Sequence, residues 1–253
     1  GRGHHHRLVL DQELRYPDSL GMLYSAFTAY CGFRVNGGEG ELMGLAPFGT
    51  PRHLDVIMSR LVDLHDDGSF HLDADYFAYL RGRRTTNRRF HDLFGGPPRP
   101  LGSPPGRREA DLAASVQAAT EEILLAMALH AHDRSGLGAL CVGGGVALNC
   151  VANGRLAREG PFDDVWVQPA AGDAGNAIGA GLWAWHEVAG GQRTVVRPDG
   201  MRGAFLGPRF STEEIAAWLD RSGVRHRRLT DDELVADIAS RLADGSVVGW
   251  FRG

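Results

Sequence analysis

Three consecutive glycines follow a short apolar run in the middle of the chain. Leu140–Val142 has the character of a short buried strand, and Gly143, Gly144 and Gly145 lead from it into a helix-like segment near Asn149. A strand, a glycine turn and a helix leave several backbone N–H groups directed at one place, where a phosphate or a carboxylate can bind. A tight structural turn explains the same pattern equally well. The lysine of a Walker-type phosphate loop is absent, and the glycines lack the spacing of a dinucleotide fold.

A single acid occupies a second strand-to-helix turn. Asp173 stands between Gly172 and Ala174, directly after the turn that begins at Pro169. A carboxylate at this place can cap the following helix, and the pattern alone favours that interpretation. It can also face the same cleft as the glycine turn and hold a metal, because ligands of α/β folds bind at the carboxyl ends of strands.

Two further acids, Glu39 and Glu41, lie in a glycine-rich loop that runs from Gly32 to Gly49. A ribose presents two neighbouring hydroxyl groups, and one carboxylate can accept hydrogen bonds from both. An ordinary surface loop with solvated acids is the simpler interpretation, and the pattern alone favours it.

Alternating helix and strand signals around these turns predict an α/β fold. Helices are expected at 20–30, 51–64, 109–135, 174–186, 211–219 and 230–243, and strands at 7–14, 140–142, 164–168 and 246–251. The arginine- and proline-rich stretch from Arg81 to Arg108 is expected to be a linker or a mobile loop. Both ends of the sequence suggest an excerpt of a longer protein, since the last predicted strand is followed by only two residues.

Composition narrows the function classes. The net charge of −4 and the pI of about 6.3 give no basic surface for nucleic acid or an acidic membrane. All 27 basic side chains are arginine, so no lysine can form a Schiff base or bind phosphate. Three irregularly spaced cysteines suit a reducing cytosol, and no apolar run approaches the roughly 20 residues of a membrane span. The expected location is cytoplasmic, and His4–His6 is expected to be a solvated turn or a tag-like remnant.

The three chemical segments together resemble the O-carbamoyltransferases of the nodulation and antibiotic-tailoring type. The resemblance covers most of the chain and rests on the stretches 16–28, 38–49, 144–154, 168–175 and 248–253. Members of that family have an actin- and sugar-kinase-like domain, similar to the tRNA threonylcarbamoyl-transfer enzymes, followed by a YrdC-like α/β domain. The resemblance therefore implies that residues 1–200 are mostly the second lobe of the first domain, without its first lobe. Residues 201–253 would be a linker and the truncated start of the YrdC-like domain.

The resemblance also implies an activity. Family members make a carbamoyl adenylate from carbamoyl phosphate and ATP, and then move the carbamoyl group to an acceptor hydroxyl with a bound divalent metal, usually iron. Carried over by position, Gly144, Gly145 and Asn149 line the nucleotide, with Gly143 and Gly172 beside them. Glu39 then faces the ribose. Asp173 becomes the metal ligand and the catalytic residue, in place of a helix cap.

The chain departs from the family pattern at two points. The family's metal site includes two histidines four residues apart, and no pair in this sequence has that spacing. His130 and His132 are two apart on a helix and so lie on different faces, which favours packing or surface roles. The family often has lysine where Glu41 stands, so Glu41 receives no role. The chain alone is expected to be unable to make carbamoyl adenylate, which an assay of pyrophosphate release would test.

Two other functions remain in view. Threonylcarbamoyl transfer to tRNA is disfavoured by the acidic balance, and a tRNA gel-shift experiment would decide it. A non-catalytic nucleotide-binding module would bind ATP without turnover. The leading prediction is carbamoyl transfer to a small-molecule hydroxyl, with neither nucleic acid nor a membrane as partner. A homodimer is considered as an assembly, and the sequence does not name the acceptor.

Overall fold

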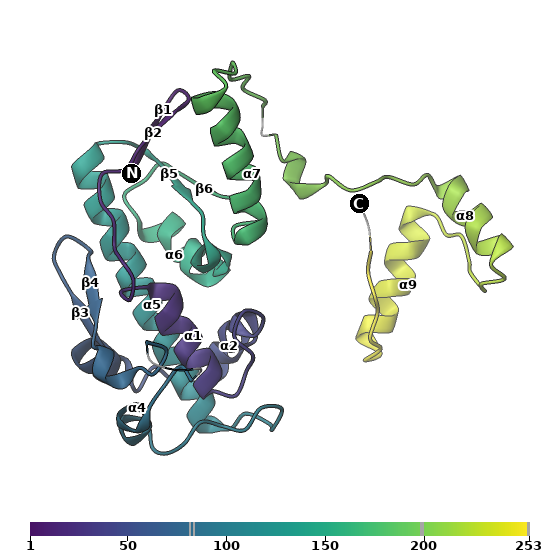
Figure 1. Ribbon diagram of the computed structural model, residues 1–253. Coiled ribbons are helices and arrows are strands. Elements are labelled where there is room, and N and C mark those ends of the chain that lie inside the picture. Colours follow the sequence, from purple (N-terminus) through teal and green to yellow (C-terminus); the bar gives the residue numbers. More distant parts are fainter. Residues whose placement is uncertain (81, 83, 198–199, 252–253) are drawn as a thin grey trace. The chain divides into compact units, whose positions relative to one another are not determined.

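The structure is a computed structural model that describes residues 1–80, 82, 84–197 and 200–251. The chain divides into two compact units, Gly1–Arg193 and Thr194–Gly253, which are described separately (Figure 1). The predicted domain boundary at residue 200 falls near this division and stays a prediction.

The first unit contains seven of the labelled helices in its described residues. They are α1 (Leu20–Tyr30), α2 (Glu39–Leu45), α3 (Leu54–Val56), α4 (Arg88–Leu93), α5 (Arg107–Ser135), α6 (Cys150–Glu159) and α7 (Asp173–Trp183). The predicted helix at 20–30 is confirmed, and the Ser19 hydroxyl caps it by accepting from the Met22 N–H. The stretch described as a glycine-rich loop contains the short helix α2 and a 3-10 turn at Ala46–Phe48.

The strands of the described residues form three separate pairs. They are β1 (Arg2–His4) with β2 (Arg7–Val9), β3 (Val62–Leu64) with β4 (Phe70–Leu72), and β5 (Ala139–Val142) with β6 (Asp164–Val167). The first two pairs are antiparallel. β5 and β6 run parallel, with Ala139 opposite Asp164 and Val142 opposite Val167. Joining parallel strands requires a crossover, which α6 supplies. This β5–α6–β6 unit and the helices around it give the mixed α/β architecture.

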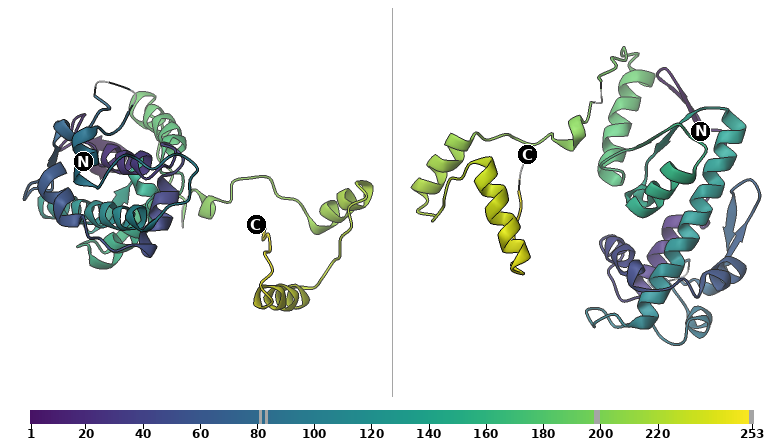
Figure 2. Two further views of the ribbon diagram at one scale, coloured as in Figure 1. Left: turned by 90° about the horizontal axis from the view of Figure 1, so that it is seen from below. Right: turned by 180° about the vertical axis from the view of Figure 1, so that it is seen from behind.

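The core of the first unit lies along α5. Helices α1, α2 and α6 each contact it, and α1 lies beside α5 in both figures (Figures 1 and 2). Four aromatic side chains fill one end of this core: Phe27, Tyr30, Phe90 and Phe94. Their rings meet edge-on or tilted, and the centroids of Phe27 and Phe90 are 5.1 Å apart. Such pairs add to the free energy gained from burial alone.

Helix α5 is also long and apolar enough to cross a membrane by length and composition. Half of its most apolar window is buried inside the protein. The buried core helix of a soluble protein has the same length and composition. The features of α5 therefore do not decide whether the chain has a membrane span, and the absence of one stays a prediction.

Helix α7 differs from α5 because none of its residues is buried. Ile178, Leu182 and Trp183 are 41%, 54% and 53% exposed. All five tryptophans of the chain share this exposure, whereas the packed aromatic core consists of Phe and Tyr. The exposed tryptophans are Trp166, Trp183, Trp185, Trp218 and Trp250.

The second unit contains α8 (Thr212–Arg221) and α9 (Asp231–Ala243), which confirms both predicted helices. Each begins with a capping box, in which Ser211 pairs with Glu214 and Thr230 pairs with Glu233. No residue of either helix is buried. Their ends are therefore determined locally, while their apolar side chains remain exposed.

Three predictions of local structure need correction. The predicted helix at 51–64 is confirmed only in part: α3 and the π-helical turn Ile57–Leu61 that continues it are helical, whereas Val62–Leu64 form β3 and pair with β4. The expected linker at 81–108 contains α4 and the first turn of α5. Its Phe90 and Phe94 enter the core, while Arg81 and Arg83 lie outside the described residues.

The third error concerns the predicted strand at 246–251. The structure assigns no strand there, and Val247, Trp250 and Phe251 are exposed. A strand needs a neighbouring strand for its backbone groups, and residues 246–251 pair with none among the described residues. The last two residues of the motif, 252 and 253, lie outside the described residues.

Candidate functional site

The loops that follow β5 and β6 lie together at the carboxyl edge of the parallel pair. The glycine loop, defined as residues 143–149, follows β5, and the turn that carries Gly172 and Asp173 follows β6. The Gly144 N–H donates to the Ala171 carbonyl at 2.8 Å. A methyl group placed on Gly172 would lie 3.7 Å from the Leu148 side chain. The structure thus brings together two of the three predicted segments.

The three glycines face open space. A methyl group added to Gly143, Gly144 or Gly145 would have no heavy atom within 4 Å. Gly144 also has φ of +91°, a conformation that side-chain-bearing residues rarely adopt. The absence of side chains leaves this backbone accessible to a ligand, as the sequence predicts, although the Gly144 N–H already has a partner.

Asp173 begins α7 but does not cap it. The N-cap residue is Gly172, which has no side chain for the task. The carboxylate of Asp173 lies in the first helical turn, where a negative charge is favourable. The side chain is exposed, and within the described part of the chain no side chain pairs with it. It is therefore free to contact a ligand, as a catalytic or metal-binding acid requires.

Glu39 is held at the start of α2 by three hydrogen bonds. Its carboxylate accepts from the Ser25 hydroxyl at 2.9 Å, the Asn36 N–H at 3.0 Å and the Gly37 N–H at 2.9 Å. Burial alone would raise the pKa of Glu39, but the bonds from Asn36, Ser25 and Gly37 outweigh it and keep that pKa below its ordinary value. The side chain is ionised and oriented, and its oxygens already serve the loop that would have to share them with a ribose.

Helix α1 connects Glu39 with the glycine loop. A methyl group on Gly21 would lie 3.6 Å from Val146 in that loop. Ser25, one helical turn further along α1, holds Glu39. Residues four apart share a helix face, so the two contacts lie one turn apart on the same side of α1. All three predicted segments are therefore neighbours through this helix, while a single cleft shared by all of them stays a prediction.

The side chain of Asn149 is buried and 8% exposed. Its Oδ1 accepts from the Ala152 N–H at 3.0 Å and so caps α6. Its amide also pairs head to head with the amide of Gln117 on α5, at 2.8 and 3.1 Å. The side-chain amide of Asn149 is therefore already hydrogen-bonded within the protein. Its predicted contact with a nucleotide stays a prediction.

Sequence reasoning did not identify the partners that hold these residues. Tyr24 and Gln117 are buried in α1 and α5, and Ser25 of α1 is half-buried. A polar residue within the apolar periodicity of a helix was the available signal, and Gln117, beside Val116, carried it. Asn153, in the first turn of α6, donates to the Ala147 carbonyl at 2.7 Å, and its buried Oδ1 has no partner in the structure.

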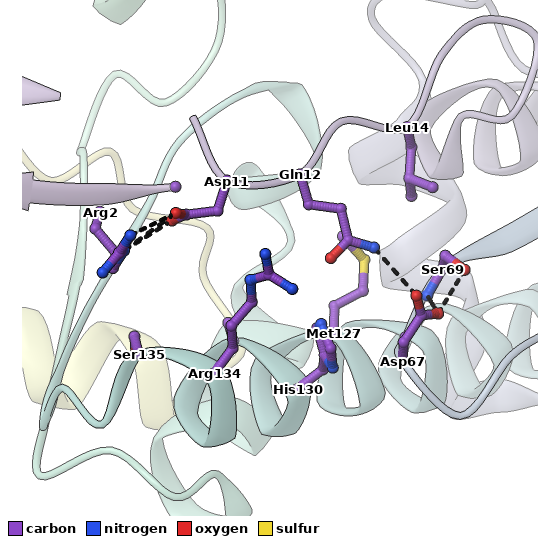
Figure 3. Close-up of a pocket in the computed structure, with 13 residues that line it drawn as sticks. Arg2, Asp11, Gln12, Leu14, Asp67, Ser69, Met127, His130, Arg134 and Ser135 are labelled. Carbon is purple, nitrogen blue, oxygen red and sulfur yellow. Dashed lines mark hydrogen bonds and ion pairs between the residues drawn. The ribbon is translucent and has the colours of Figure 1, made fainter. Parts of the chain in front are cut away.

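A separate cavity of about 230 Å³ lies between the N-terminal segment and the second half of α5 (Figure 3). Arg2, Asp11 and Arg134 lie at one end of it, and Gln12 reaches Asp67 at the other. None of the predicted site residues lines this cavity.

A metal requires more donors than the site provides. Asp173 offers one carboxylate, and no group of three or more His, Cys, Asp or Glu side chains able to hold a metal occurs among the described residues. Protein sites for divalent transition metals use several such ligands. The described part of the chain therefore does not fit the predicted iron site by itself, and any further ligands would have to come from outside it.

These features define a class: an α/β unit with accessible loops at the carboxyl ends of parallel strands, where α/β proteins bind their ligands. The family comparison is more specific. Residues 3–182 match the model of the carbamoyltransferase N-terminus. The chain belongs to this family, and this part is the actin-like part of carbamoyltransferases.

Several relatives support the same family. The chain is 50% identical over 253 residues to the protein called uncharacterized protein sll1178 of Synechocystis, covering 99% of this chain and 41% of that protein. It is 33% identical over 250 residues to nodulation protein NolO of Bradyrhizobium diazoefficiens, covering 97% and 42%. Nodulation protein NolNO of Sinorhizobium fredii is 33% identical over 237 residues, covering 93% and 32%. The chain thus spans about two fifths or less of the length of these relatives.

Proposed function

We propose that the chain takes part in ATP-dependent transfer of a carbamoyl group from carbamoyl phosphate, through carbamoyl adenylate, to a hydroxyl of a small molecule. The observation that carries the proposal is the joined pair of loops after β5 and β6. Their hydrogen bond from Gly144 to Ala171 places an open glycine backbone beside the turn that bears Asp173. Family membership supports carbamoyl transfer, and the relation to ATP and carbamoyl phosphate follows from it.

In this proposal the glycine loop receives the phosphate of the adenylate. Backbone N–H groups without neighbouring side chains can approach a phosphate closely. Glu39, ionised and held by Ser25, would accept hydrogen bonds from the ribose hydroxyls. The open space above Gly143–Gly145 is what supports this placement.

The transfer step exchanges one bond for another. The acceptor hydroxyl oxygen forms a bond to the carbamoyl carbon, and the bond from that carbon to the AMP phosphate oxygen breaks. AMP leaves with the bonding electron pair, and the hydroxyl proton passes to a base or to water. The residues of this chain would contribute mainly by positioning the adenylate, which can account for a large part of a rate enhancement. Asp173, exposed beside the loop, is the acid available to contact the reacting groups.

The remaining expectations belong to this proposal. The acceptor is a small molecule, nucleic acid and membranes are not partners, and the location is the cytoplasm. The net charge of −4 supports only the expectation about nucleic acid and membranes, because it provides no electrostatic attraction for polyanions.

Nucleotide binding by the chain tests the site. Because a methyl group at Gly145 meets no protein atom, Gly145→Ala should fold normally but intrude on the ligand. We expect its affinity for ATP or AMP, measured by isothermal titration calorimetry, to fall about tenfold, the equivalent of ~1.4 kcal/mol. Gly179→Ala is the matched control, since it adds a methyl group to equally open space within α7.

Turnover requires the complete reading frame that contains the chain. There, Asp173→Asn should abolish carbamoyl transfer while preserving the fold, because the amide keeps the size but loses the charge. Equal nucleotide affinity in Gly145→Ala and wild type would remove the glycine loop from the mechanism. Carbamoyl transfer by Asp173→Asn at the wild-type rate would show that the Asp173 carboxylate has no role in the mechanism.

A further inference from the structure

A buried hydrogen-bond network connects the two halves of the candidate site. Gln117 of α5 is its centre and is 5% exposed. Its Oε1 accepts from the Tyr24 hydroxyl at 3.1 Å and from Asn149 Nδ2 at 2.8 Å. Its Nε2 donates to Glu121 Oε1 at 2.7 Å and to Asn149 Oδ1 at 3.1 Å. Both donors and both acceptor positions of this one amide are therefore used.

The network has only one consistent direction. The Glu121 carboxylate accepts a hydrogen bond in this network, which places the nitrogen of Gln117 toward it. The oxygen of Gln117 must then face Tyr24. Burial, followed by the charges of Glu39 and Glu121, raises the pKa of Tyr24 well above its ordinary value, so its hydroxyl keeps the proton that it donates. Arg155 of α6 lies 3.7 Å from Glu121 and extends the network to the next helix.

The network ends at Tyr24, next to the residue that holds Glu39, and at Asn149, in the glycine loop. Tyr24 immediately precedes Ser25, which holds Glu39. Asn149 closes the glycine loop and caps α6 through the Ala152 N–H. A change at Gln117 would therefore loosen the glycine loop from both α1 and α5, although Gln117 itself lies beneath the site.

We propose that Gln117 is a positioning residue that fixes the glycine loop against α1, so that Gly143–Gly145 and Glu39 keep their relative places. The role in nucleotide binding rests on the proposed function, whereas the mechanical role does not. Gln117 contacts no ligand in this proposal and acts through Asn149 and Tyr24.

Two variants remove the network in different ways. Gln117→Met keeps the volume but deletes all four hydrogen bonds and leaves the Asn149 amide without its partner. Tyr24→Phe deletes a single bond and retains the amide pair, so it should fold even if the first variant does not. The control is Thr120→Val, a buried position on the same helix whose hydroxyl bonds only to the Val116 carbonyl.

Hydrogen exchange of the ligand-free chain tests the mechanical role. Peptides that cover the glycine loop should exchange about tenfold faster in Gln117→Met and about threefold faster in Tyr24→Phe, in line with the loss of several bonds and of one. Peptides from the N-terminal end of α5, where Arg108 lies over the Tyr30 ring, should not change, and Thr120→Val should match wild type throughout. Unchanged exchange of the loop in both network variants would overturn the proposal.

Nucleotide affinity tests the functional role. Gln117→Met should bind ATP about tenfold more weakly, as expected for a loop that has lost its fixed position. If wild type binds no nucleotide but loop exchange still rises in Gln117→Met, the proposed function fails and the positioning role stands. If wild type binds and the variants bind equally well with an unchanged loop, the positioning role fails and the proposed function stands.

A third variant separates positioning from general stability. Gln117→Glu has the same shape but cannot donate while ionised, and its charge would lie beside Glu121. Protonation returns one O–H donor. The affinity of this variant relative to wild type should therefore recover as the pH is lowered, whereas that of Gln117→Met should not. A constant ratio for Gln117→Glu across the pH range would contradict a role for the directed hydrogen bonds.

Discussion

Helices α5 and α7 are both apolar, but only one of them forms a core. Leu112, Val116 and Ile123 of α5 are fully buried among α1, α2 and the aromatic cluster. Ile178 and Leu182 of α7 stay exposed because no described segment covers them. Apolar composition predicts burial only where a second element supplies the opposite surface. The candidate site lies between these two situations, with its glycine loop tied to α5 and Asp173 carried by α7.

The largest expected effect is a difference in stability between variants of α5 and variants of α7. Leu112→Ala removes a fully buried side chain and should lower the free energy of unfolding by about 2–5 kcal/mol. Leu182→Ala removes the same atoms from a residue that is 54% exposed and should change it by less than about 0.5 kcal/mol. Urea denaturation followed by far-UV circular dichroism measures both. Similar losses for the two variants would show that α7 is covered in solution.

A smaller effect compares a buried helix cap with an exposed one. Asn149→Ala removes the cap of α6 and leaves Gln117 partly unpaired, so the first unit should lose about 1–3 kcal/mol. Ser211→Ala removes an exposed cap of α8 and should only speed amide exchange within that helix. The same denaturation experiment and peptide-level hydrogen exchange distinguish these results. A loss of first-unit stability in Ser211→Ala would contradict the independence of the two caps.

The smallest expected effect is a dependence on acid pH at Glu39. Its folded-state pKa lies below the ordinary value of 4.5, so the unfolded chain takes up the proton more readily. The resulting stabilisation is present above pH 4.5 and is lost as the pH falls through the folded-state pKa. Glu39→Gln should remove this contribution and flatten that part of the stability profile. Parallel profiles for the variant and wild type would show that other carboxylates account for the acid sensitivity.

Sequence patterns were sufficient to predict elements that depend only on neighbouring residues along the chain. Ser19, Ser211 and Thr230 cap helices α1, α8 and α9, which begin within one residue of their predicted starts. The two strands at 140–142 and 164–168 and the glycine turn after the first were also predicted, whereas their parallel pairing comes from the structure. Long-range packing was not predicted. Phe90 and Phe94 belong to a stretch whose arginines and prolines indicated a linker, and only their contacts with Phe27 and Tyr30 make it part of the core.

The site shows the same limit. The sequence identified residues that could meet a ligand, such as Gly144 and Asp173, because their types suit that chemistry. It could not show that the Glu39 carboxylate would accept hydrogen bonds from Ser25 and from its own loop. Nor could it show that the Asn149 side chain would point inward and bond to Gln117. Those outcomes depend on which side chains α1 and α5 present to each other, and a one-dimensional pattern does not specify that register.

The placement of the tryptophans affects how this protein should be observed. All five lie on β6, α7 and its continuation, and the second unit, where they are about half exposed, so indole emission would start from partly solvated side chains. Melting of the Phe- and Tyr-lined core around α5 would then pass almost unseen in a fluorescence trace. A sudden blue shift on adding another protein or a ligand would instead report that the bare α7 side had become covered.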